Sequence, residues 1–168
     1  IIDPAAGRQV ATVKQSGATG HEVVASPDGK TAYVPIYGDS GVGRPGSDGR
    51  TLDVIDIASR RRVATIDFGG PERPHCAVFG PDGRLYVTTE TTISVKVIDP
   101  RTNTVVDTLP TSQKESHMLA LSGDGRTAEH SAVARTCARA RGRGQDGRAA
   151  DIQLHRRLRD PGLGVSQA

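Results

Sequence analysis

The chain has 168 residues, of which 35% are hydrophobic and 24% charged, and these proportions exclude a disordered or membrane-embedded protein. No apolar stretch approaches the length of a bilayer span, so we expect no membrane insertion. The chain contains 20 Gly and 10 Pro but only 3 Tyr, 2 Phe and no Trp, which favours many tight turns over long helices.

The net charge of +3 arises in the last quarter of the chain. Residues 1–126 carry 14 Lys and Arg against 15 Asp and Glu, whereas residues 127–168 carry 8 Arg against 4 acids. The body of the protein is therefore close to neutral and has no field that would steer it towards nucleic acid or an anionic surface. The two cysteines, Cys76 and Cys137, lie one in each region and do not indicate a disulfide framework.

A repeat runs through the first three quarters of the chain. Three segments begin at His21, His75 and His117, and each histidine precedes an aspartate by seven residues. A second motif, Ile-Asp-Pro or Ile-Asp-Ile, begins at positions 2, 55 and 98, at spacings of 53 and then 43 residues. Each unit contains four short runs rich in β-branched residues between turn signals, which predicts a four-stranded antiparallel meander.

In chain order, we expect the last two strands of one unit, four strands of a second, four of a third and the first of a fourth, within residues 1–13, 20–69, 75–110 and 117–122. The strands of the second unit are expected at about 22–26, 31–36, 52–58 and 62–67. Between the first and second strands, Pro27-Asp28-Gly29 and Pro81-Asp82-Gly83 predict tight hairpins, because Pro presets φ and Gly accepts a positive φ.

A repeat of roughly 40 to 50 residues with four strands is typical of a β-propeller blade. The predicted fold class is thus all-β, a partial β-propeller with about two complete blades plus flanking strands, over residues 1–126. Because closing a ring takes about 4 to 8 blades, these strands predict a piece of a larger propeller.

Three stretches carry a family resemblance: Val-Ile-Asp-Pro-Arg-Thr-Asn-Thr-Val (97–105), Ser-Pro-Asp-Gly-Lys-Thr-Ala-Tyr-Val (26–34) and Gly-Pro-Asp-Gly-Arg-Leu-Tyr-Val-Thr-Thr (80–89). They look like the YVTN-type propeller repeat, and the order of the segments resembles bacterial YncE-like proteins. The resemblance implies a β-propeller that is monomeric when complete, in the periplasm or outside the cell. It does not imply one activity, since relatives of this repeat include lactonase-like enzymes, haem d1-binding domains and surface proteins with no known chemistry.

The pattern changes after Arg126. Residues 127–168 hold 8 Ala, 8 Arg, no aromatic residue and no Lys, as a slip of reading frame in a GC-rich gene would produce. We expect an irregular tail there that is disordered or frameshifted. The alternative is an Arg- and Gly-rich arm for nucleic acid, but the aromatic residues that stack on bases are missing, so we expect no nucleic-acid partner.

The repeated histidines are the candidate binding residues. His21, His75 and His117 each begin an innermost strand, so they are expected on one face near the propeller axis, where imidazoles could bind a metal, an anion or the iron of a tetrapyrrole. In the alternative, each ring bonds a backbone carbonyl and rings of different blades lie too far apart to share an ion. Cys76 should point away from His75 and pack between blades.

The long loop of residues 38–49 is expected on the same face as the histidines. Its candidate binding residues are Asp39, Arg44, Asp48 and Arg50, which could reach over the channel mouth as a lid, and the alternative is a solvated insertion. The loop also contains a GxGxxG pattern at 41–46, but no helix follows it, so a dinucleotide site is not expected.

Few residues of the sequence indicate catalysis. No serine elbow and no Cys/His arrangement indicates a nucleophile, and Glu22 and Glu90 are the only acids we nominate for the channel. The expected function is therefore a binding module, without demonstrable catalysis, that takes a small molecule or a protein on the propeller face. No cofactor is the first expectation. The alternative is part of a lactonase-like hydrolase or of a redox propeller that binds haem d1 or a metal.

Overall fold

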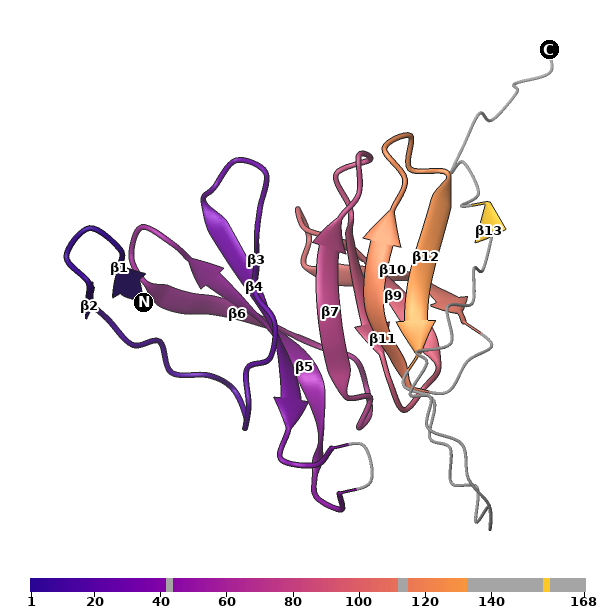
Figure 1. Cartoon of the computed structure of the whole chain (residues 1–168), viewed down its shortest axis with the longest axis horizontal. Helices are drawn as coiled ribbons and strands as arrows, with labels where there is room; N and C mark the ends of the chain where they lie inside the picture. Colours follow the sequence, from indigo (N-terminus) through magenta and orange to yellow (C-terminus); the bar gives the residue numbers. More distant parts are fainter. Residues whose placement is uncertain (42–43, 112–114, 133–155, 158–168) are drawn as a thin grey trace, which may run out of the picture.

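The computed structural model describes residues 1–41, 44–111, 115–132 and 156–157, and every regular element in these ranges is a β-strand (Figure 1). β1 and β2 form a short pair, and two four-stranded sheets and a three-stranded sheet follow. The strands are β1 (Ile2–Asp3), β2 (Arg8–Gln9), β3 (Val24–Ala25), β4 (Thr31–Gly38), β5 (Asp48–Asp56), β6 (Arg61–Asp67), β7 (Pro74–Phe79), β8 (Leu85–Thr89), β9 (Ser94–Asp99), β10 (Thr104–Pro110), β11 (Ser116–Leu121), β12 (Thr127–Ala132) and β13 (Arg156–Arg157).

Each of the two complete sheets is an antiparallel meander in chain order, β3-β4-β5-β6 and β7-β8-β9-β10. The first strand of the third sheet, β7, contacts β4 of the second sheet and β11 of the fourth. These sheets confirm the all-β class and the four-stranded units that the repeat predicted. Within the described ranges there is no helix whose length and apolarity would suit a membrane crossing.

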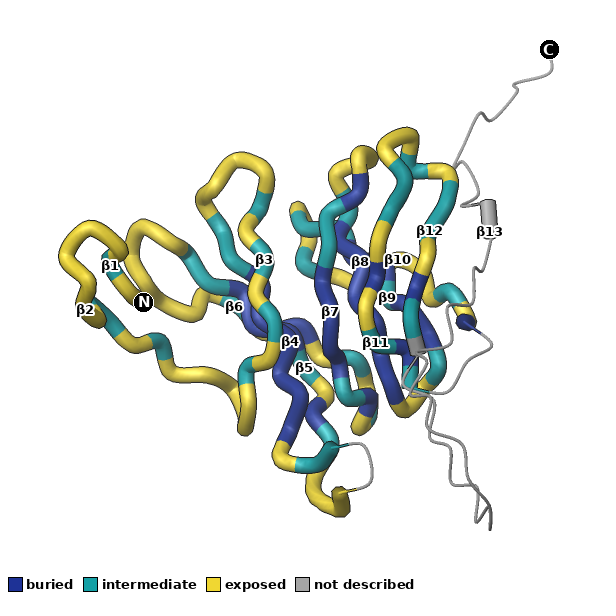
Figure 2. The backbone as a smooth tube through the Cα atoms, in the orientation of Figure 1, coloured by how far each residue is buried: buried dark blue, intermediate teal, exposed yellow. Residues whose placement is uncertain are grey.

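The core fills the spaces on both sides of the third sheet. Along β8, Leu85 and Val87 pack against the second sheet, while Tyr86 faces the fourth, as the two-residue period of a strand requires. Figure 2 shows buried residues concentrated in the inner strands β4, β7, β8 and β9, with the outer strands β6 and β10 mostly exposed. Cys76 is buried with Tyr86 and Leu119 between the third and fourth sheets, which confirms that it packs between blades.

The hairpin turns follow the predicted chemistry. Asp28 accepts hydrogen bonds from the Ser26 hydroxyl at 2.6 Å and from the Lys30 N–H at 3.1 Å, and these bonds hold its pKa below the ordinary value. Gly29 has a φ of 69°, the left-handed conformation that a side chain disfavours. The Asp28 carboxylate therefore has a structural role in the turn.

Two boundaries differ from those predicted by four residues or more. β5 begins at Asp48 rather than near residue 52, because pairing with β4 continues past an irregularity to Gly38 and Asp48. At that irregularity Gly49 lies against the Ile36 carbonyl so closely that a β-carbon would collide with it. The connecting loop is therefore shorter than the sequence indicated.

The second difference concerns the expected end of the repeat at Arg126, which is six residues too early. β12 continues the fourth sheet over Thr127–Ala132, and Leu121 pairs with Ala128 as Ala25 pairs with Ala32 in the second sheet. The physical reason is the Asp124 hairpin, which returns the chain alongside β11. The rest of the predicted tail, with Cys137, lies outside the described residues except for β13, so its predicted disorder or frameshift stays a prediction.

Candidate functional site

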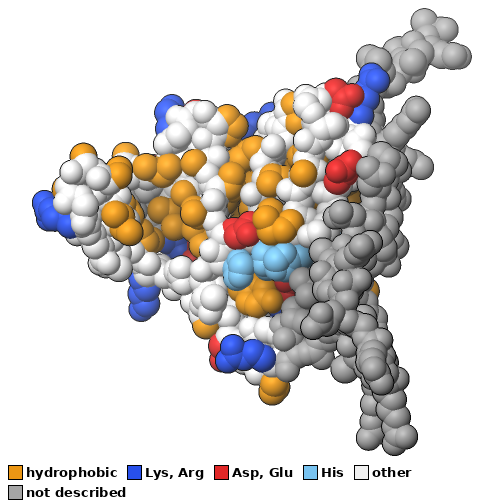
Figure 3. All heavy atoms as spheres, in the orientation of Figure 1, with side chains coloured by type: hydrophobic (Ala, Val, Ile, Leu, Met, Phe, Trp, Pro, Cys, Tyr) orange, Lys and Arg blue, Asp and Glu red, His pale blue; other side chains and the backbone are white. Residues whose placement is uncertain are grey.

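Three histidines from the starts of three successive sheets stack on one another. His21 lies just before β3, His75 lies in β7 and His117 in β11. The ring centroids are 4.1 Å apart between His21 and His75 and 3.7 Å apart between His75 and His117, with tilts of 42° and 39°. In Figure 3 histidine side chains form one pale blue patch. The predicted shared face is confirmed, and neighbouring rings of the stack are in contact. Whether two of these rings share an ion stays a prediction.

The stack is buried at its centre and open at its ends. His75 is 2% exposed, whereas His21 is exposed and the His117 side chain keeps 33% of its surface. Burial, with the neighbouring His117 and His21, lowers the pKa of His75 to about 3, so its ring is neutral at physiological pH. Its Nδ1 is buried and finds no hydrogen-bond partner among the described residues.

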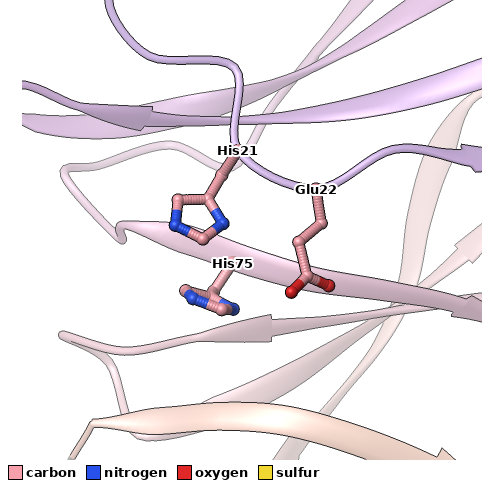
Figure 4. Close-up of side chains that lie close together, drawn as sticks. All are labelled: His21, Glu22 and His75. Carbon is pink, nitrogen blue, oxygen red and sulfur yellow. The ribbon is translucent and has the colours of Figure 1, made fainter.

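On the outer side of His75, the Glu22 carboxylate lies beside the histidine stack. Figure 4 shows His21 and Glu22, from the segment before β3, projecting towards the His75 ring on β7. One ligand atom from each of these residues lies within 4.8 Å of the others. His21 is exposed and Glu22 half-buried, so this group faces solvent.

On the inner side of the stack lies a buried acid, Glu90. It follows β8, and its side chain is fully buried. Its Oε2 accepts hydrogen bonds from the Tyr37 hydroxyl at 2.7 Å and from Arg73 Nη1 at 3.3 Å. Its Oε1 lies 4.0 Å from His117 Nε2 and has no hydrogen-bond partner in the described part of the chain. Burial and the Glu90 carboxylate raise the pKa of Tyr37 to about 12, which keeps its phenol protonated as a donor.

Arg73 connects Glu90 to the long loop. Its Nε and Nη2 donate to Asp48 Oδ1 at 2.9 and 2.8 Å, and its guanidinium carbon lies 5.6 Å from the Tyr37 ring centroid. The Ser40 hydroxyl also donates to Asp48. Against the effect of burial, the bonds from Ser40 and Arg73 hold the pKa of Asp48 below its ordinary value. We call Asp48, Arg73, Glu90 and Tyr37 the polar network.

Of the four candidate residues in and beside the loop, Asp48 alone belongs to the polar network. Asp39 accepts a bond from the Ser47 N–H within the loop, and the exposed Arg44 forms a backbone bridge with Gly41. Arg50 lies on β5 and pairs with Asp67 at 2.9 Å. Residues 42–43 lie outside the described residues, and the role of the loop as a lid stays a prediction.

Sequence reasoning missed Tyr37 and Arg73 and nominated Glu90 only as an acid. Aligning the repeats by their backbone bonds shows why they meet. The Tyr37 N–H donates to the Thr19 carbonyl at 2.8 Å, and the Glu90 N–H donates to the Arg73 carbonyl at 3.2 Å. Tyr37 and Glu90 therefore occupy equivalent positions in the second and third sheets. Thr19, Arg73 and Glu115 each precede a histidine by two residues, and each has a positive φ, of 53°, 50° and 58°. That shared offset from the histidine is the signal that would have found Arg73.

The arrangement favours binding over nucleophilic chemistry. Imidazole nitrogens and carboxylate oxygens come together in two sets, His21–Glu22–His75 and His75–Glu90–His117, and both residue types ligate metals. Cys76, next to His75 in β7, is buried, and burial raises the pKa of its thiol to about 11, so it is not a thiolate at neutral pH.

The sequence matches no protein-family model and no curated protein. Among solved structures, the chain is similar to hydrazine synthase of Kuenenia stuttgartiensis, with a TM-score of 0.55 and 21% identity over 74% of this chain. The matched part is 32% of that chain, so the present sequence spans about a third of its length. This neighbour supports the propeller-like, all-β fold class. At 21% identity the likeness extends to the fold alone, because one fold serves many functions.

Proposed function

We propose that the chain is a β-propeller module of the YVTN-repeat type whose histidine face binds a small ligand. The three quoted stretches at 26–34, 80–89 and 97–105 support the repeat type. The observation that carries the proposal is the convergence of three imidazoles, from three separate sheets, into one stack with ring separations of 4.1 and 3.7 Å.

A purely structural role accounts poorly for this convergence. Two of the three rings keep contact with solvent, so the stack contributes little to the apolar core. Beneath it lies a fully buried carboxylate, Glu90, and a buried ion pair is weak evidence for stability because its desolvation offsets the attraction. Titratable groups whose pKa values are strongly shifted by burial and by titratable neighbours, as that of His75 is, cluster instead at functional sites, which supports the proposal.

The test is histidine-selective NMR of the full chain, in which imidazole ¹⁵N resonances are followed during titration with three probes: zinc chloride, haemin and an aldonolactone. We expect at least one probe to shift the resonances of His75 and His117. His130, on β12 and outside the stack, is the internal reference. The same probe should leave the spectrum of a His117→Ala variant unchanged at His75.

The proposal is wrong if no probe shifts His75 or His117 more than it shifts His130. Consumption of the lactone during the titration would instead favour the lactonase-like alternative, since a binding module returns its ligand unchanged.

A further inference from the structure

We infer that His75, Glu90 and His117 form a site for one divalent transition-metal ion of the zinc type, with Tyr37 and Arg73 as residues that position the Glu90 carboxylate. The inference rests on the proposed binding face and names its ligand.

The first support comes from two buried polar atoms that have no protein partner in the described ranges, His75 Nδ1 and Glu90 Oε1. His75 is 2% exposed and Glu90 1% exposed, so bulk solvent does not reach either atom. Both atoms belong to residues of one metal-compatible group, His75–Glu90–His117. A cation bound through His75 Nδ1 and Glu90 Oε1 would satisfy both atoms at once.

The second support is distance. The ligand atoms of the group all lie within 4.8 Å of one another, and Glu90 Oε1 is 4.0 Å from His117 Nε2. Bonds of about 2.1 Å in a tetrahedral site would separate ligand atoms by about 3.4 Å. The side chains therefore need to converge by about 1 Å, and His117, which is one-third exposed, has room to move.

The third support is the way Glu90 is held. Tyr37 and Arg73 both donate to Oε2, which fixes the carboxylate and leaves Oε1 directed to the histidines. Hydrogen bonds of this kind from outer groups orient metal ligands and keep their affinity high. The positive charge of Arg73 is shared with Asp48, so the three charged side chains together carry one net negative charge, which favours a dication.

The donor set selects the class of ion. Two imidazole nitrogens with one carboxylate suit zinc and its transition-metal neighbours, whereas calcium and magnesium prefer oxygen ligands alone. Three protein ligands leave a fourth position for water or a small ligand, on the side where His117 is exposed.

The neighbouring group, His21–Glu22–His75, is the matched comparison. It shares His75, but His21 is exposed and Glu22 is half-buried, and neither has an unpartnered buried atom. Substitutions in this outer group test whether the ion sits on the inner or the outer side of His75.

The experiment measures zinc binding to the full, chelator-treated chain by equilibrium dialysis, with cobalt(II) as a spectroscopic probe of coordination. We expect one equivalent of zinc and a visible cobalt absorption typical of low coordination number. Glu90→Gln and His117→Ala should weaken zinc binding by about a hundredfold, and Tyr37→Phe, which keeps every ligand, by about tenfold. Glu22→Gln, His21→Ala and His130→Ala should change the affinity by less than about twofold. Far-UV circular dichroism of each variant checks that it is folded.

Unchanged zinc affinity in folded Glu90→Gln or Tyr37→Phe protein would overturn the inference, as would loss of binding in Glu22→Gln rather than Glu90→Gln. Calcium or magnesium displacing zinc at similar concentration would also overturn it. If haemin or the lactone shifts the His75 resonance but zinc does not, the metal site is wrong and the proposed binding face stands. If no probe shifts it, both are wrong.

Discussion

The second and third sheets begin with the same motif yet differ in how it is buried. In the second sheet the first strand, β3, has two residues and His21 is exposed. In the third sheet β7 has six residues and His75 is 2% exposed. β7 packs between β4 and β11, whereas β3 contacts β4 and β7. The motif thus sets the turn and the chain direction, and the neighbouring sheets decide the length and burial of the strand.

The same two sheets also differ at equivalent polar positions. Thr19 and Tyr37 of the second sheet correspond to Arg73 and Glu90 of the third. Arg73, Glu90 and Tyr37 then join in one network across the sheet boundary. The candidate site therefore arises where the repeat diverges, while the conformation that places these residues is common to both sheets.

The largest change in the free energy of unfolding is expected where equivalent positions of the two sheets differ most in burial. Val23 is 68% exposed and Ala77, its counterpart in β7, is 7% exposed. Ala77→Asp would bury an unpaired charge against the second sheet and should lower the free energy of unfolding by about 3–5 kcal/mol. Val23→Asp should change it by less than about 0.5 kcal/mol. Urea denaturation measures both, and equal effects would contradict the comparison.

The second prediction concerns the divergent position 73. Arg73→Met leaves the buried Glu90 carboxylate with Tyr37 as its remaining donor, so we expect a loss of about 3 kcal/mol in the free energy of unfolding. Arg50→Met is the matched control, because Arg50 and Asp67 form an ion pair whose side chains are half exposed, worth at most about 1 kcal/mol. If both variants unfold at the same urea concentration, the polar network contributes no more to the free energy of unfolding than an exposed ion pair does.

More of the fold than of the candidate site could be predicted from the sequence. The seven-residue offset from histidine to aspartate and the Pro-Asp-Gly turns are local signals, so the strands and the shared face of His21, His75 and His117 could be predicted. The contact between Tyr37 and Glu90 joins residues 53 positions apart in two sheets, and it depends on how closely those sheets pack. No local pattern encodes that distance. The strand β12 was missed for another reason. Its residues do not resemble the second strands of the other units, yet the turn at Asp124 pairs them with β11.

The third prediction uses pH to distinguish the buried histidine. The pKa of His75 is lowered to about 3 in the folded protein, below the ordinary 6.5 that we assume for the unfolded chain. The unfolded state therefore binds a proton first, so this contribution to stability is complete above pH about 6.5 and is lost as the pH falls towards 3, by about 1.4 kcal/mol for each pH unit. In chelator-treated protein, His75→Gln should flatten the dependence of the free energy of unfolding on pH between about 6 and 4. An unchanged slope would show that His75 titrates normally.

The smallest effect tests the conformation that the two sheets share. Thr19 has a φ of 53°, as Arg73 has 50°, and a β-branched residue is strained in this region by about 1–2 kcal/mol. Thr19→Gly should raise the free energy of unfolding by about 1 kcal/mol, because the ordering of a glycine offsets part of the relief. Thr31→Gly in β4 is the control and should lower it by about 0.5–1 kcal/mol. At position 73 the same exchange removes the bonds to Asp48 and Glu90, so Arg73→Gly should destabilise the protein despite the relief. A rise in the free energy of unfolding for Thr19→Gly with a fall for Arg73→Gly would show that the two sheets share the backbone conformation but not the role of the side chain. A change of the same sign in both variants would contradict this.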